Sequence, residues 1–166
     1  MLIVLSGLPG VGKTTIAREL ARRLIAVHVR IDSIEEGIRR SAAHASAPMD
    51  DAGYLAGYAV AEDNLRLGHT VIADSVNPWP LTRDAWTEVA RRAGTKSIDI
   101  EIVCSDERAH EHRLTSRAVD PPGLKPLTFQ EVLARDYRHW TRDHVIVDTA
   151  RKSVQECVDE ILAAIP

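Results

Sequence analysis

The chain has 166 residues, of which 45% are hydrophobic, so it can form one globular domain with a sizeable core but has no room for a second. Its formal net charge of −3 argues against a broadly basic surface for nucleic acids or membranes. The first residues lack the basic segment of a secretory signal, and no apolar run is long enough to span a bilayer, so we expect a cytoplasmic protein with no membrane partner. Cys104 and Cys157 fall in apolar patterns and are expected to be buried thiols.

A phosphate-binding loop follows the first apolar run, which covers residues 2–5. Residues 7–14 read Gly-Leu-Pro-Gly-Val-Gly-Lys-Thr, and a helical pattern begins directly after them. Glycines let the backbone N–H groups turn inward around phosphates, Lys13 can reach the β- and γ-phosphates, and Thr14 can offer its hydroxyl to Mg²⁺. We therefore predict an ATP and Mg²⁺ site, with the choice between ATP and GTP left open. Its cofactor-binding residues are Gly7, Leu8, Pro9, Gly10, Val11, Gly12, Lys13, Thr14 and Thr15.

The remaining chain alternates apolar runs with helical patterns, which predicts an α/β fold with a parallel sheet and helices on both faces. Further strands are expected at 27–31, 70–73, 98–102 and 145–147. The first of these alternates apolar residues with His28 and Arg30, which is typical of an edge strand with one buried face. Helices are expected at 16–24, 34–40, 54–67, 81–93, 106–117, 128–140 and from 153 onward.

Two connections stand out between these elements. Residues 41–53 are small and include proline, which is typical of a mobile loop. Asp-Pro-Pro-Gly at 120–123 starts a second loop, and we expect a small lid at approximately 113–127. The helices beyond it are expected to begin with capping boxes, Thr128 with Glu131 and Ser153 with Glu156.

Acidic residues follow two of the predicted strands. Ligands of open α/β sheets bind beyond the carboxyl ends of the strands, so Asp32 and Asp74 are expected to face the phosphate-binding loop. There Asp32 could accept the proton of an attacking hydroxyl, and Asp74 could hold Mg²⁺ through a bound water. Helix capping is the alternative role for each of them.

Arginines lie on the helix that leads into the predicted lid. Arg113 and Arg117 are four residues apart and therefore share a helix face, from which they could stabilise phosphoryl charge as a lid closes. The alternative is a solvated surface face. His110 and His112 lack the helical spacing of metal ligands and are expected to be surface residues.

Together, residues 7–14, the strand end at 30–32, the segment 71–78 and the helix carrying Arg113 and Arg117 resemble the small P-loop kinase family. That family includes gluconate kinases, chloramphenicol phosphotransferase, adenylylsulfate kinase and polynucleotide kinase domains, and the similarity is greatest to polynucleotide-kinase-like predicted kinases. The resemblance implies a P-loop NTPase fold with sheet order 2-3-1-4-5, γ-phosphoryl transfer from Mg-ATP to a hydroxyl, and Asp32 as the base. It also implies that adenine packs near Arg117 and the turn at 149–152, which makes Arg151 a candidate contact.

The chain departs from polynucleotide kinases one turn after the base, where they carry an arginine and this chain has Glu35. A nucleic-acid end is therefore a less favoured acceptor than a small molecule. Tyr54, Tyr58 and Glu62 share one helix face, a stripe equally typical of a pocket wall and of core packing. The candidate substrate-binding residues are Asp32, Arg39, Tyr54, Tyr58 and Asn77.

The leading hypothesis is an ATP-dependent kinase that phosphorylates a hydroxyl-bearing small molecule. Its candidate catalytic residues are Lys13, Asp32, Arg113 and Arg117. One alternative is a polynucleotide 5′-hydroxyl kinase, and another is a nucleotide-binding or nucleotide-hydrolysing switch protein without a phosphate acceptor. The sequence leaves open the acceptor and the oligomeric state.

Overall fold

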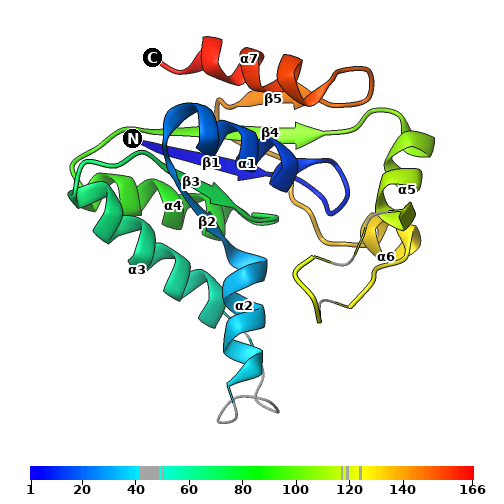
Figure 1. The fold of residues 1–166 in the computed structure, drawn as a ribbon, viewed down its shortest axis with the longest axis horizontal. Coiled ribbons are helices and arrows are strands. Elements are labelled where there is room, and N and C mark those ends of the chain that lie inside the picture. Colours follow the sequence, from blue (N-terminus) through cyan, green and yellow to red (C-terminus); the bar gives the residue numbers. More distant parts are fainter. Residues whose placement is uncertain (42–48, 50, 117, 119, 124) are drawn as a thin grey trace.

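The computed structural model describes residues 1–41, 49, 51–116, 118, 120–123 and 125–166. Its central feature is a five-stranded parallel sheet in the order β2-β3-β1-β4-β5 (Figure 1). The strands are β1 (Leu2–Ser6), β2 (Val27–Arg30), β3 (Val71–Asp74), β4 (Ser97–Val103) and β5 (Val145–Asp148). The predicted fold class and the edge position of β2 are confirmed.

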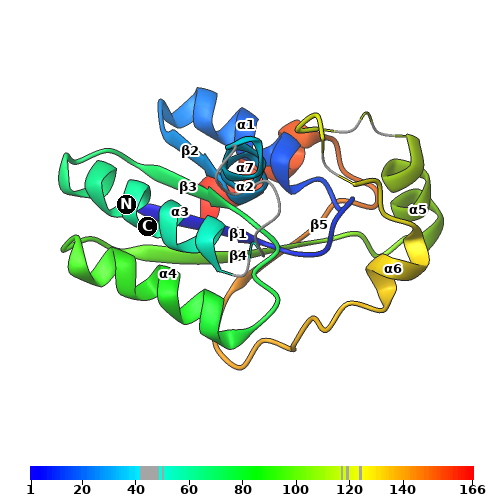
Figure 2. The same ribbon diagram turned by 90° about the horizontal axis from the view of Figure 1, so that it is seen from below.

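Helices cover both faces of this sheet, as Figures 1 and 2 show. The helices of the described chain are α1 (Lys13–Leu24), α2 (Ile31–Arg40), α3 (Ala52–Arg66), α4 (Pro80–Arg92), α5 (Glu107–Ser116), α6 (Phe129–Leu133) and α7 (Val154–Ala164). Both predicted capping boxes are present, at the starts of α6 and α7. Helix α2 starts directly after β2, three residues earlier than predicted, so Asp32 lies in its first turn. The predicted mobile loop at 41–53 lies mostly outside the described residues.

The core consists of two clusters, because successive side chains of a strand point to opposite faces of the sheet. Ile3 and Leu5 of β1 pack with the α1 and α7 helices, whereas Leu2 and Val4 pack with α3 and α4. Both cysteines are thiols without a disulfide, Cys157 fully buried and Cys104 partly buried.

The strand register aligns the carboxyl ends of three strands. Leu5 of β1 pairs with Asp74 of β3, and Arg30 of β2 pairs with the same residue. The loop after β1, the end of β2 and the end of β3 therefore meet at one edge of the sheet, as expected for a ligand site in an α/β fold.

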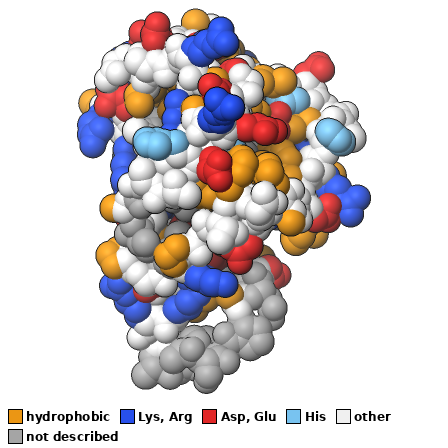
Figure 3. Space-filling model, turned by 90° about the vertical axis from the view of Figure 1, so that its right-hand side faces the viewer, with side chains coloured by type: hydrophobic (Ala, Val, Ile, Leu, Met, Phe, Trp, Pro, Cys, Tyr) orange, Lys and Arg blue, Asp and Glu red, His pale blue; other side chains and the backbone are white. Residues whose placement is uncertain are grey.

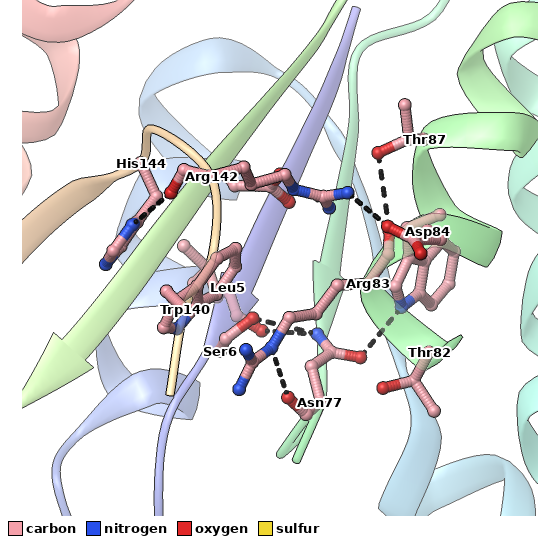
Figure 4. A network of polar contacts seen from close by, with 12 residues as sticks. Leu5, Ser6, Asn77, Thr82, Arg83, Asp84, Thr87, Trp140, Arg142 and His144 are labelled. Carbon is pink, nitrogen blue, oxygen red and sulfur yellow. Dashed lines mark hydrogen bonds and ion pairs between the residues drawn. The ribbon is translucent and has the colours of Figure 1, made fainter. Parts of the chain in front are cut away.

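Helix α6 is shorter than predicted, since it ends at Leu133 and the chain then runs irregularly to β5. Arg83 of α4 is buried and holds this segment (Figure 4). Its guanidinium donates to the carbonyl of Arg138 at 2.7 Å and to the carbonyl of His139 at 3.3 Å, and lies 4.1 Å from the Trp140 ring centre. A long-range contact thus holds, in an irregular conformation, the segment that was predicted to form the last turns of the helix.

Candidate active site

The loop after β1 has the backbone of a phosphate cradle. Gly7, Gly10 and Gly12 all have positive φ angles, and a Cβ atom on Gly7 would lie 2.2 Å from the carbonyl oxygen of Ile102. In the described part of the chain, no hydrogen-bond acceptor is found for the backbone N–H groups of Gly10, Val11 and Gly12. Donors that the protein leaves unpaired at the start of a helix suit phosphate oxygens.

Asp74 lies beside this cradle at the end of β3. Its carboxylate accepts hydrogen bonds from Thr14 and from Nε2 of His28, the latter at 3.1 Å. Burial raises the pKa of Asp74, but the hydrogen bond from His28, the charge of Lys13 and the hydrogen bond from Thr14 together outweigh burial and lower it. A buried carboxylate that stays ionised next to a threonine hydroxyl fits the oxygen ligands that Mg²⁺ prefers.

Arg30 is the functional candidate that the sequence analysis missed. Only 9% exposed, its side chain approaches Asp32 at 3.7 Å, Asp74 at 4.0 Å and Asp120 at 3.0 Å. Its Nε atom is buried and has no hydrogen-bond acceptor among the described residues. The alternation in β2 predicted a solvent-facing arginine, whereas the structure encloses it among carboxylates at the site.

The predicted lid segment touches the site through Asp120. Its carboxylate accepts from Arg18 of α1 at 2.6 Å and pairs with Arg30, and its carbonyl also accepts from Arg30. The pKa of Asp120 is lowered. The main cause is the hydrogen bond from Arg18, whose effect is larger than the opposing effect of burial. The described part of residues 118–127 thus lies along the site.

These groups line one large cavity with a volume of about 1490 Å³. Predicted site residues that line it are Pro9, Gly10, Gly12, Lys13, Thr14, Thr15, Asp32, Arg39, Tyr54, Tyr58, Asp74 and Arg113. Asp32 has a side chain that is 44% exposed, and Glu35 lies one turn further along α2. Burial, and then the neighbouring charge of Asp32, raise the pKa of Glu35.

Asn77 lies elsewhere, in the core next to the site. It is fully buried, and its amide donates to the carbonyl of Leu5 and to Oγ of Ser6, both at 3.1 Å, while Trp86 donates to its Oδ1 at 3.1 Å (Figure 4). Its φ is +48°, in the left-handed region that asparagine tolerates. All of its polar atoms are used to brace the turn, so the structure disagrees with the predicted substrate contact.

Tyr54 and Tyr58 both pack against the core and line the cavity, the two roles that the sequence left open. Tyr58 packs edge-on against buried Trp86, with ring centres 4.6 Å apart, and Tyr54 lies 5.9 Å from Tyr58. Both also line the cavity. Arg39 lines it as well, and pairs with Glu35 at 3.3 Å.

Of the predicted arginines, Arg113 holds the loop after β5. Its guanidinium donates to Oγ1 and to the carbonyl of Thr149, both at 2.8 Å, and the Thr149 hydroxyl in turn contacts the Val11 carbonyl at 2.9 Å. Arg117 lies outside the described residues. Arg151 is exposed and is absent from the described residues that line the cavity.

His110 is not the surface residue that the sequence predicted. It is 5% exposed, its Nε2 lies 2.7 Å from the Pro9 carbonyl, and its ring packs edge-on against Phe129 of α6. A carbonyl only accepts, so Nε2 carries the proton. His112 is exposed as predicted. Helix α5 therefore supports the phosphate-binding loop directly.

The fold and this site define a P-loop protein with the fold of a kinase. A family model described as an AAA domain matches residues 2–135, and the chain belongs to that family. No curated protein matches the chain. The predicted relationship to the small P-loop kinases is confirmed by this family and by the solved structures with the same fold.

Three solved structures illustrate the likeness. A gluconokinase from Sinorhizobium meliloti is 23% identical, with a TM-score of 0.63 over 97% of this chain and 89% of that chain. The APS kinase CysC of Mycobacterium tuberculosis, in complex with AMPPNP and APS, is 17% identical, with a TM-score of 0.72 over 98% and 95%. Kti12 from Chaetomium thermophilum, in complex with ADP-AlF3, is 22% identical, with a TM-score of 0.70 over 100% of both chains. At these identities the likeness shows a common fold.

Over the described residues, each helix falls short of the length or the apolar character that a bilayer crossing requires.

Proposed function

We propose that the protein is an ATP-dependent phosphotransferase that moves the γ-phosphoryl group of Mg-ATP to a hydroxyl of a small molecule. One observation carries the proposal: a single buried guanidinium, that of Arg30, lies within 4.0 Å of both Asp32 and Asp74 in one cavity. Asp74 adjoins the phosphate-binding loop, and Asp32 faces the open part of the cavity. A protein that only bound nucleotide would not need the second carboxylate there.

We assign nucleotide binding to the phosphate-binding loop and to the side chains of Lys13, Thr14 and Asp74. The unpaired N–H groups of Gly10, Val11 and Gly12 would hold phosphate oxygens together with Lys13, and the Thr14 hydroxyl and the Asp74 carboxylate would hold Mg²⁺. Bound there, Mg²⁺ supplies charge neutralisation at the phosphate oxygens.

On the acceptor side, Asp32 would orient the hydroxyl and take its proton. Arg30 would stabilise the negative charge that phosphoryl transfer spreads over the equatorial oxygens, because its guanidinium lies within 4.0 Å of both carboxylates. Preorganised cations in a site that excludes water are effective because the surrounding groups need not rearrange during the reaction.

Two parts of the helix α5 region have supporting roles in this proposal. Arg113 acts as a positioning residue, since its contacts with Thr149 fix the loop beside Val11. Arg117 remains a prediction for a residue that arrives with the lid. Closure of the segment 113–127 would exclude water from the reacting groups.

The test is phosphoryl transfer from γ-labelled ATP to a panel of alcohols, sugars and antibiotics. We expect labelled product from at least one of them and its loss in Asp74→Asn, whereas Asp63→Asn, an exposed residue of α3, should match the wild type. Transfer to a 5′-hydroxyl oligonucleotide instead, with binding that weakens steeply with salt, would identify a polynucleotide kinase. ATP binding with no transfer to any acceptor would favour a nucleotide switch.

A further inference from the structure

The acceptor side of the cavity has an apolar wall formed by Leu55, Trp79 and Leu81. All three line the cavity, and they are 57%, 46% and 77% exposed. They come from the start of α3 and the start of α4, two helices that pack against each other. Single exposed hydrophobic side chains are ordinary, but several at the mouth of a pocket mark a binding surface.

Aromatic rings extend this wall towards Asp32. The hydroxyl of Tyr54 accepts from the backbone N–H of Asn77 at 3.3 Å, and that of Tyr58 donates to the Thr82 carbonyl at 3.4 Å. Trp79 similarly donates its ring N–H to Asp136 at 3.2 Å. Because their polar atoms bond to the protein, these rings offer the cavity mainly apolar surface.

Charged side chains of both signs lie on the same side of the cavity. The lining there includes the acidic side chains of Asp32, Glu35 and Asp51 and the basic side chains of Arg30, Arg39 and Arg135. Arg39 is already paired with Glu35 at 3.3 Å. In Figure 3, hydrophobic, acidic and basic side chains lie next to one another near the middle of one face of the molecule. Because the two signs balance, the apolar wall is the feature that distinguishes this side of the cavity.

Resting on the proposed function, we infer that the acceptor is an alcohol with an apolar, ring-containing body. Its hydroxyl approaches Asp32, and its body packs on Leu55, Trp79 and Leu81. The cavity of about 1490 Å³ exceeds the roughly 300–1,000 Å³ of a pocket for one ligand, so nucleotide and acceptor can occupy it together.

Binding of small alcohols to the full chain saturated with Mg-AMPPNP tests this inference without requiring transfer. The probes are 3-phenyl-1,2-propanediol, its cationic counterpart 2-amino-1-phenylethanol, glycerol and gluconate, with affinities measured by calorimetry. Burial of a phenyl ring should make the two aromatic probes bind about tenfold or more tightly than glycerol and gluconate. Equal or tighter binding of gluconate, or no binding of either aromatic probe, would overturn the inference.

Two matched variants locate the binding surface. Leu81→Asn should weaken binding of phenylpropanediol about fivefold and leave glycerol unchanged, because only the ring contacts the wall. Leu67→Asn changes a leucine of similar exposure, 74%, that is not among the described lining residues, and should have no effect. Equal affinity of both variants for phenylpropanediol would overturn the inference. Aromatic binding that depends on Leu81, without transfer to any alcohol, would support the inference and refute the kinase reaction.

Discussion

Replacing Asn77 distinguishes a bracing residue from a substrate contact. Asn77→Gly removes three buried hydrogen bonds, those to Leu5, Ser6 and Trp86, and keeps a backbone that accepts the φ of +48°. At roughly 1 kcal/mol for each bond, the free energy of unfolding should fall by about 3 kcal/mol. Asn77→Ala should cost about 1 kcal/mol more, because a Cβ without a local hydrogen bond is strained at positive φ.

Urea unfolding followed by circular dichroism measures these free energies, and acceptor KM measured below the unfolding range separates stability from binding. We expect both variants to be less stable, with an acceptor KM close to that of the wild type. A stability within about 0.5 kcal/mol of the wild type, combined with a raised KM, would refute the bracing role and return Asn77 to the substrate site.

Three further predictions follow. Since burial raises the pKa of Glu35, the native state binds its proton more tightly than the unfolded state does, and stability falls as pH rises from about 4.5 through the raised pKa. Urea unfolding should therefore show that Glu35→Gln gains more stability at pH 7 than at pH 4. Glu62→Gln should lose more stability at pH 7 than at pH 4, since the hydrogen bond from Arg92 lowers the pKa of Glu62. The same change of stability with pH in both variants would contradict this link between pKa and stability. Arg30→Lys keeps the positive charge but loses the planar guanidinium, so turnover should fall on the order of 100-fold while ATP affinity stays nearly unchanged. Turnover equal to that of the wild type would show that Arg30 has no role in phosphoryl transfer. His110→Ala should weaken ATP binding about fivefold in calorimetry, for a lost hydrogen bond to the loop, and His112→Ala should not; equal affinities would contradict the supporting role.

The sequence predicted features that depend on local patterns. The phosphate-binding loop, the capping boxes at Thr128 and Ser153 and the acidic residue at the end of β3 all follow from neighbouring residues. The sheet order came from the family resemblance rather than from any pattern, because pairing of distant strands leaves little local signal.

Long-range contacts explain what the sequence did not predict. Helix α6 ends at Leu133, and Arg83, 55 residues before Arg138, holds the irregular segment that replaces its predicted last turns. Arg30 and His110 were expected at the surface, but residues far along the chain enclose them: Asp120 covers Arg30, and Pro9 accepts from His110. In each case a charged or polar side chain is buried only because a distant partner satisfies it, and periodicity carries no information about that partner.

The central claim is that Asp32 takes the proton of the acceptor hydroxyl. Single-turnover transfer from γ-labelled ATP, measured for Asp32→Asn with the best acceptor found, tests it most directly. Because a general base contributes typically 10²–10⁴-fold, we predict a rate at least about 100-fold below that of the wild type, with ATP affinity unchanged within about twofold. A variant that transfers phosphate at the wild-type rate would contradict the claim.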